Sequence, residues 1–158
     1  MTTQPWLLLS SRPIEQLQCA QLPLPASAFH SYASAWSVPP SGDRTDEFGR
    51  PCTRLTVGGD NIIDVQSNQL TVISSSRNVT PLYWCADHHG NFVIATDLLI
   101  AASAWVNLTD CRLGVREDAG VYLGERSSIH GISRLPPSSC LEVVLQGDRT
   151  LVERNGTA

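Results

Sequence analysis

The feature that most constrains the fold is a series of short apolar runs, separated by tight-turn signals, in the middle of the chain. Three β-branched runs occupy Cys52–Val57, Asn61–Gln66 and Gln69–Ser74, and two more follow at Leu82–Asp87 and Asn91–Thr96. The residues between them are typical of turns: Gly58-Gly59-Asp60, Ser67-Asn68 and His88-His89-Gly90. Runs of this length match ordinary strands. We therefore predict a meander of antiparallel strands, in which Gln69–Ser74 pairs with Leu82–Asp87.

Helical and strand signals follow the meander. Asp97 is placed to cap a helix over Leu98–Trp105, because a carboxylate at this position accepts hydrogen bonds from the free N–H groups of the first turn. Arg112–Leu123 is a second helical stretch, and Cys140–Leu145 and Thr150–Glu153 are strands joined by a Gly-Asp turn. We expect the meander and this C-terminal hairpin to share one core, with both helices on one side.

The N-terminal part has a different character. Prolines interrupt it at Pro13, Pro23, Pro25, Pro39, Pro40 and Pro51. We predict a short strand at Trp6–Ser10, a short helix over Ala26–Trp36 and an exposed loop over Ser37–Pro51. A chain of 158 residues is the size of one domain. We therefore expect one α+β, sheet-dominated domain over 1–158, with an irregular part over 1–51 and the regular elements over 52–158.

Charge composition limits the classes of function. Charged residues make up 16% of the chain, below the usual ~25%, and the net charge is −4. All 11 cations are arginine, so no Schiff-base or phosphate-binding lysine exists. No basic cluster is present, which argues against nucleic acid as a partner. A surface with so little charge favours association with another protein or with a second copy of the chain.

Local motifs do not indicate a catalytic or metal site. His88 and His89 are adjacent, and neither a strand nor a turn gives two neighbours the shared face that metal ligands need, so we interpret them as solvated turn residues. His30 and His130 are isolated. The five cysteines are scattered and never spaced as C-x-x-C, which indicates buried thiols: Cys19, Cys52, Cys85, Cys111 and Cys140. We expect no metal and no cofactor.

Two further patterns bear on location. The apolar patch Trp6–Leu9 is too short for a signal peptide, and no apolar run approaches the ~18 residues that cross a bilayer. We therefore expect a cytoplasmic protein that does not enter a membrane.

Two longer segments carry a family resemblance. Val72–Asp97 (VISSSRNVTPLYWCADHHGNFVIATD) contains Pro81-Leu82-Tyr83-Trp84, a hairpin, and a strand that runs into a helix start. About thirty residues later, Ile129–Val144 (IHGISRLPPSSCLEVV) contains Gly131-Ile132 and then Arg134-Leu135-Pro136-Pro137 before a strand. Their order and separation resemble the end of the N-terminal glutaminase-like domain of the asparagine synthetase family, which includes β-lactam synthetases and lasso-peptide cyclases. The resemblance implies a truncated sandwich of the N-terminal-nucleophile-hydrolase type.

This sequence departs from the family pattern at several places. Asn78 stands near a family Gly, and Ser138 replaces the Gly that follows Pro-Pro. Active members use an N-terminal cysteine whose α-amine acts as its base, whereas Thr2 stands there in this chain. The oxyanion segment G-x-[IV]-Y-N, the glutamine-holding segment S-x-D-x-E and the ATP loop S-G-G-x-D-S are all missing.

The resemblance therefore implies a non-catalytic accessory subunit. Such a subunit would dock on a separately encoded, ATP-dependent amide-forming synthetase in peptide or natural-product biosynthesis. Because the Pro-Pro segment leads toward the second domain in the family, the expected contact residues are Arg134, Leu135, Pro136 and Pro137. Two alternatives stay open: an amidohydrolase that uses Thr2 as its N-terminal nucleophile, and a β-rich binding scaffold unrelated to this family.

Overall fold

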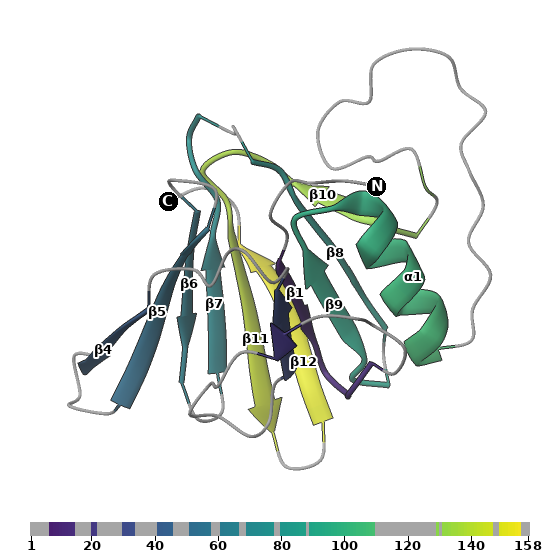
Figure 1. Cartoon of the computed structure of the whole chain (residues 1–158), viewed down its shortest axis with the longest axis horizontal. Coiled ribbons are helices and arrows are strands. Elements are labelled where there is room, and N and C mark those ends of the chain that lie inside the picture. The colour runs from purple at the N-terminus through teal and green to yellow at the C-terminus, as the bar shows by residue number, and fades with distance from the viewer. Residues whose placement is uncertain are drawn as a thin grey trace.

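A computed structural model describes residues 7–14, 20–21, 30–33, 41–45, 51–57, 61–66, 69–77, 80–87, 89–109, 129, 131–146 and 149–155. The strands in these ranges form two antiparallel sheets (Figure 1). Sheet A has the order β10-β8-β9-β1-β3-β2, with β1 (Leu7–Ser10), β2 (Ala20–Gln21), β3 (His30–Ala33), β8 (Leu82–Ala86), β9 (Phe92–Ala95) and β10 (Ser133–Leu135). Sheet B has the order β12-β11-β7-β6-β5-β4, with β4 (Ser41–Thr45), β5 (Pro51–Val57), β6 (Asn61–Val65), β7 (Gln69–Ile73), β11 (Cys140–Gln146) and β12 (Arg149–Asn155).

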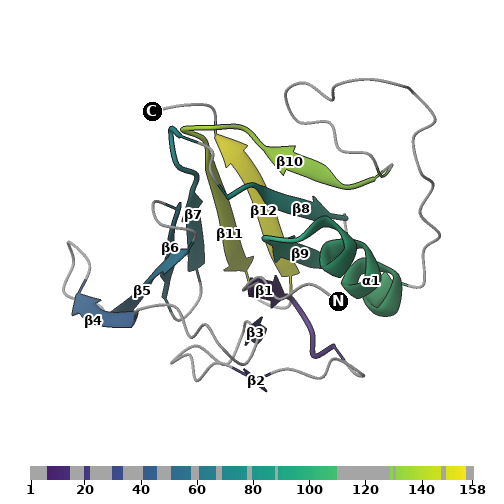
Figure 2. The same cartoon turned by 45° about the horizontal axis from the view of Figure 1, so that its top comes forward.

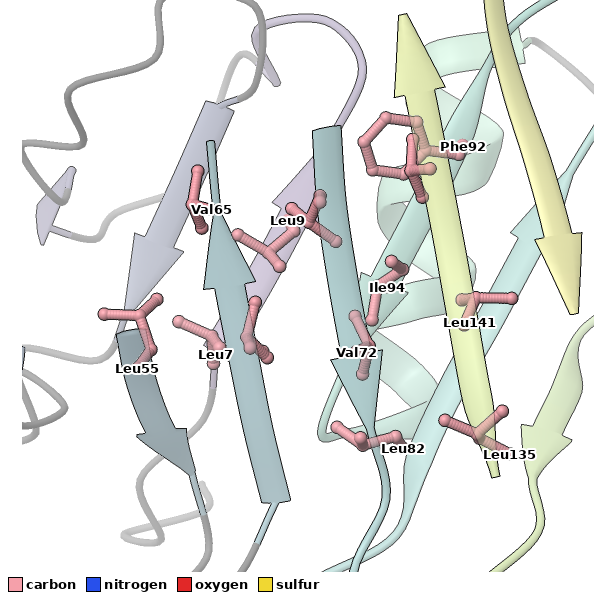
Figure 3. Close-up of a cluster of buried hydrophobic side chains, with 13 residues drawn as sticks. Leu7, Leu9, Leu55, Val65, Val72, Leu82, Phe92, Ile94, Leu135 and Leu141 are labelled. Atoms are coloured by element: carbon pink, nitrogen blue, oxygen red, sulfur yellow. The ribbon is translucent and has the colours of Figure 1, made fainter. Parts of the chain in front are cut away.

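Sheet A lies between sheet B and the helix α1 (Leu98–Thr109), so both of its faces are covered (Figures 1 and 2). We call the cluster between the two sheets the inter-sheet core; it contains Leu7, Leu9, Leu55, Ile63, Val65, Leu70, Val72, Leu82, Phe92, Ile94, Leu135, Leu141 and Val143 (Figure 3). We call the cluster between sheet A and α1 the helix-side core; it contains Leu8, Ile14, Tyr32, Cys85, Val93, Ala95, Ala101, Ala104, Trp105, Ile129 and Ile132. Because side chains alternate along a strand, neighbours such as Leu8 and Leu9 enter different cores.

The predicted helix is confirmed, and it continues to Thr109. Asp97 caps it, since its Oδ1 accepts hydrogen bonds from the backbone N of Leu99 (2.9 Å) and of Ile100 (3.1 Å). Ala101, Ala104 and Trp105 face sheet A, whereas Leu99 is 71% exposed. No helix in the described ranges is long and apolar enough to span a membrane.

The predicted strands from Cys52 onward are confirmed to within one or two residues, but one predicted pairing is wrong. Strand β7 pairs with β6 and β11, and β8 pairs with β9 and β10, so β7 and β8 belong to different sheets. The polar segment 74–81 carries the chain from sheet B to sheet A instead of forming a hairpin turn. Residues of the meander and of β11 nevertheless lie together in the inter-sheet core, although the meander is divided between two sheets and the helix-side core is a second cluster.

The N-terminal part is more regular than its sequence indicates. His30–Ala33 is strand β3 rather than part of a helix, and Ser41–Thr45 is strand β4 rather than part of a loop. Both strands form through pairing, β3 with β1 and β4 with β5, because neighbouring strands override weak local preference. The predicted strand is confirmed over Leu7–Ser10. The predicted helix over Arg112–Leu123 lies outside the described residues.

Two identical substitutions test the position of the core. Leu141 is completely buried between the sheets and Leu99 lies on the outer surface of α1. Leu141→Ala should lower the free energy of unfolding by about 2–5 kcal/mol, because it removes buried methyl groups and leaves a cavity. Leu99→Ala should change it by less than about 0.5 kcal/mol. Urea denaturation of both variants measures this, and equal losses would contradict the arrangement of the layers.

Candidate functional site

The two segments that carry the family resemblance lie side by side in the structure. Strand β10 pairs antiparallel with β8, with Arg134 opposite Tyr83 and Leu135 opposite Leu82. The next strand, β11, pairs with β7 in the other sheet, with Leu141 opposite Val72. The segment Ile129–Val144 therefore joins one edge of sheet A to the interior of sheet B, and its Pro-Pro turn connects the two sheets.

The four expected contact residues have different environments. Leu135 is 1% exposed and belongs to the inter-sheet core. Arg134 is half-buried on the opposite face, beside Tyr83, and its side chain forms no hydrogen bond or ion pair with any described residue. Pro136 is half-buried and Pro137 is exposed. The turn thus presents Arg134 and Pro137 at the surface, while Leu135 fixes the turn to the core.

The buried hydroxyl of Ser74 fixes the Pro-Pro turn to segment 74–81, which crosses from sheet B to sheet A and is called the crossing segment below. Ser74 Oγ donates to the carbonyl oxygen of Pro136 (2.5 Å) and accepts from the backbone N of Ser139 (2.8 Å). The backbone N of Ser74 donates to the carbonyl oxygen of Ser139 (2.9 Å). Ser74 and Ser139 are both almost fully buried, and buried polar groups stabilise a fold only when they are hydrogen-bonded in this way.

Asn61 extends the same network to the start of β8. Its Oδ1 accepts from the backbone N of Ser75 (2.7 Å), and its Nδ2 donates to the carbonyl oxygen of Thr80 (2.9 Å). The single buried amide therefore holds both ends of the crossing segment. Sequence analysis missed Asn61, Ser74 and Ser139; the run Ser74-Ser75-Ser76 was the available signal, since consecutive serines often satisfy backbone groups in turns.

The turn between β8 and β9 contains the histidine pair. Asp87 Oδ1 accepts from the backbone N of His89 (2.9 Å) and of Asn91 (3.0 Å), and Asp87 Oδ2 accepts from Asn91 Nδ2 (2.9 Å). Partial burial of Asp87 favours its neutral form, but these hydrogen bonds outweigh burial and hold its pKa below the usual value. His89 is exposed, as a turn residue should be. His88 and His130 lie outside the described residues.

The environments of the described cysteines are those of structural residues. Burial raises the pKa of the Cys85 thiol, and the charge of Asp87 adds to this shift, so Cys85 is protonated and unreactive at neutral pH. Cys52 is also buried, and Cys140 is half-buried. Within the described ranges no three His, Cys, Asp or Glu residues are grouped to hold a metal ion. Thr2, Cys19 and Cys111 lie outside these ranges.

No protein-family model matches the chain, and none of the curated proteins matches it significantly.

The turn itself offers a test of backbone strain. Ser138 has a φ of 55°, in the left-handed region, where a side chain other than glycine is unfavourable. Ser138→Gly should raise the free energy of unfolding by about 0.5–1 kcal/mol, since the hydrogen bond from its backbone N to the carbonyl oxygen of Ser75 is kept. Thermal and urea unfolding measure this gain. Ser76→Gly, at an exposed position with ordinary φ, should give none, and a loss at Ser138 would contradict the turn geometry.

Proposed function

We propose that the chain is a non-catalytic accessory subunit, related to the glutaminase-like domain of asparagine-synthetase-type enzymes. In this proposal it docks on a separate subunit that forms amide bonds with ATP. One observation carries the proposal: the segments Val72–Asp97 and Ile129–Val144 pair with each other in both sheets. The two segments that carry the resemblance are therefore neighbours in the fold as well as in the order of the chain.

Two further features support the family relationship. The described layers, two facing antiparallel sheets with a helix on the outer face of one, are compatible with an N-terminal-nucleophile-hydrolase sandwich. Ser138 also has a left-handed backbone, a conformation that glycine, the residue of the family pattern after Pro-Pro, can adopt without strain. A left-handed backbone at this position is therefore compatible with a glycine in the family pattern.

The sequence supports a structural rather than a catalytic role. The chain lacks the family's oxyanion and glutamine-holding segments and contains no lysine. The candidate contact surface at the Pro-Pro turn combines a cation that pairs with no described residue, Arg134, with the exposed ring of Pro137. An arginine at the centre of an interface forms directional hydrogen bonds with carboxylates, so an acidic patch on the synthetase is the expected counterpart.

A charge reversal at Arg134 tests the docking surface. Arg134→Glu should weaken the complex with an asparagine-synthetase-like subunit from the same source by roughly tenfold or more, because it places like charges together in the interface. Binding is measured by co-purification and by titration calorimetry. Arg12→Glu makes the same charge change at an exposed position beyond the end of β1 and should leave binding unchanged. Leu135→Asp is unsuitable, because Leu135 is a core residue and the variant would unfold.

The docking proposal has a clear contrary outcome. If the folded chain binds no synthetase-like subunit, and the synthetase alone has full activity, the accessory role is wrong. Equal effects of Arg134→Glu and Arg12→Glu would instead show that the contact lies elsewhere.

The same proposal also predicts that the chain has no glutaminase activity of its own. The purified chain should release no ammonia from glutamine above background, and Thr2→Ala should leave the activity of the complex unchanged. Ammonia release and product formation by the complex are the measurements. Loss of activity in Thr2→Ala, with the fold and the complex retained, would replace this proposal with the N-terminal-nucleophile mechanism.

A further inference from the structure

The face of sheet B that points away from sheet A, called the outer face below, is not covered by any described helix or strand. The helix α1 lies against sheet A instead (Figures 1 and 2). Along β6 and β7 the side chains of the outer face alternate with those of the inter-sheet core. One of them, Ile73, is 40% exposed although it is large and apolar.

Strand pairing arranges the outer side chains of β5, β6, β7 and β11 in two rows that cross the sheet. The charged row consists of Arg54, Asp64, Thr71 and Glu142, each directly opposite the next. The isoleucine row lies beside it and consists of Thr56, Ile62, Ile73 and Cys140, paired in the same way. All eight side chains are at least partly exposed. The outer face therefore carries charged and apolar groups in a fixed order.

The two ends of the charged row have unused and complementary hydrogen-bonding capacity. Arg54 binds Asp64 through Nε (2.7 Å) and Nη2 (2.8 Å), which leaves the two N–H groups of Nη1 without an acceptor among the described residues. Glu142 is half-buried, and its carboxylate forms no hydrogen bond or ion pair with any of these residues. Three strand spacings, about 14 Å in all, separate the two ends within one copy. They are too far apart to pair with each other in the monomer.

We propose that the outer faces of two copies of the chain pack against each other, about a two-fold axis that runs along the strands between β6 and β7. This symmetry reverses the order of the strands in the second copy. Arg54 of each copy then faces Glu142 of the other, so the unused donors meet the unused carboxylate. In the neighbouring row, Ile62 of each copy faces Ile73 of the other, which buries the exposed apolar side chain.

The strand order and the charges favour this axis over its alternatives. The axis lies at the centre of the six-stranded sheet, so all six strands overlap. An axis along β6 would place Asp64 against Asp64 of the second copy, and an axis along β7 would place Asp64 against Glu142. An axis across the strands at the charged row would place each of its residues against the same residue. Like charges in contact across an interface weaken it.

The size of the outer face predicts a weak dimer. Six strands spaced about 4.8 Å apart, with about five residues each, cover roughly 24 Å by 17 Å, or about 400 Å² on each copy. A total of about 800 Å² is at the small end for a specific interface. We therefore expect a reversible dimer whose Kd is in the micromolar range. The outer face is also separate from the Pro-Pro turn, which follows the edge strand of sheet A.

Charge variants of the purified full-length chain, without any synthetase, test the ion pair independently of the proposed function. Analytical ultracentrifugation from micromolar to millimolar concentration should show a dimer that Glu142→Arg weakens about tenfold or more, because it places two cations together. Glu142→Gln and Arg54→Gln should each weaken it several-fold. The double variant should be no weaker than Arg54→Gln alone, since either change removes the same pair. Additive effects would show that the two residues do not meet.

A matched pair of apolar-to-acidic changes tests the surface. Ile73→Asp should weaken the dimer about tenfold or more, because it buries a charge against Ile62 of the second copy. Val106→Asp makes the same kind of change at an equally exposed position (40%) on α1 and should leave the dimer unchanged. Thermal unfolding of both variants shows that they are folded. Equal weakening by the two changes would place the contact elsewhere.

Chemical cross-linking tests the register. The proposed axis places residue 56 of each copy over Cys140 of the other, at about the 10 Å that separates two packed sheets. A bis-maleimide reagent of this span should therefore cross-link Thr56→Cys into a covalent dimer, above the level of the wild type. Adding Cys140→Ser should return cross-linking to the wild-type level. Cross-linking that persists without Cys140 would overturn the register, and a wild-type chain that is monomeric at every concentration would overturn the proposal.

Discussion

The structure depends on the burial of both faces of sheet A. Its strands β1 and β9 are buried at every residue, and their sequences, LLLS and FVIA, lack the polar alternation of a half-exposed strand. Sheet B covers one face and α1 covers the other. Strand β6 of sheet B shows the opposite pattern, with buried and half-buried residues alternating, because only its inner face meets apolar side chains. Sheet A is therefore the middle layer, and neither sheet B nor α1 can be removed without exposing it.

Polar interactions have two different roles around these layers. The buried hydroxyl of Ser74 and the amide of Asn61 hold the crossing between the sheets, where unsatisfied groups would cost roughly 1–3 kcal/mol each. On the outer face of sheet B, Arg54 and Asp64 form a two-point ion pair at 2.7 and 2.8 Å, which raises the pKa of Arg54. That pair is partly exposed, so water screens it and its contribution to stability is small. The internal network holds the crossing between the sheets in place, while the external pair adds little to stability.

Local sequence signals predicted most strands and the α1 cap, but not the order of the strands or the division into two cores. The runs from Cys52 onward carry β-branched residues at strand spacing, so their positions follow from local preference. Whether two successive strands pair depends on the connection between them, and 74–81 is held by Asn61 and Ser139, which are distant in sequence. Strand β4 (SGDRT) has no apolar residue at all and forms because β5 pairs with it. At the candidate site, the sequence predicted the Pro-Pro turn before a strand but did not show that the turn follows an edge strand or that Leu135 is buried.

The order of the strands along the chain has a consequence for synthesis on the ribosome. β1 is held on one side by β9, and the backbone N of Leu7 donates to Thr96 Oγ1, 89 residues away in sequence. At a translation rate of roughly 5–20 residues per second, this partner emerges about 5–20 s after β1. During that interval the apolar strand has no cover from β9 or α1, so the nascent chain presents a hydrophobic segment to chaperones before sheet A can close.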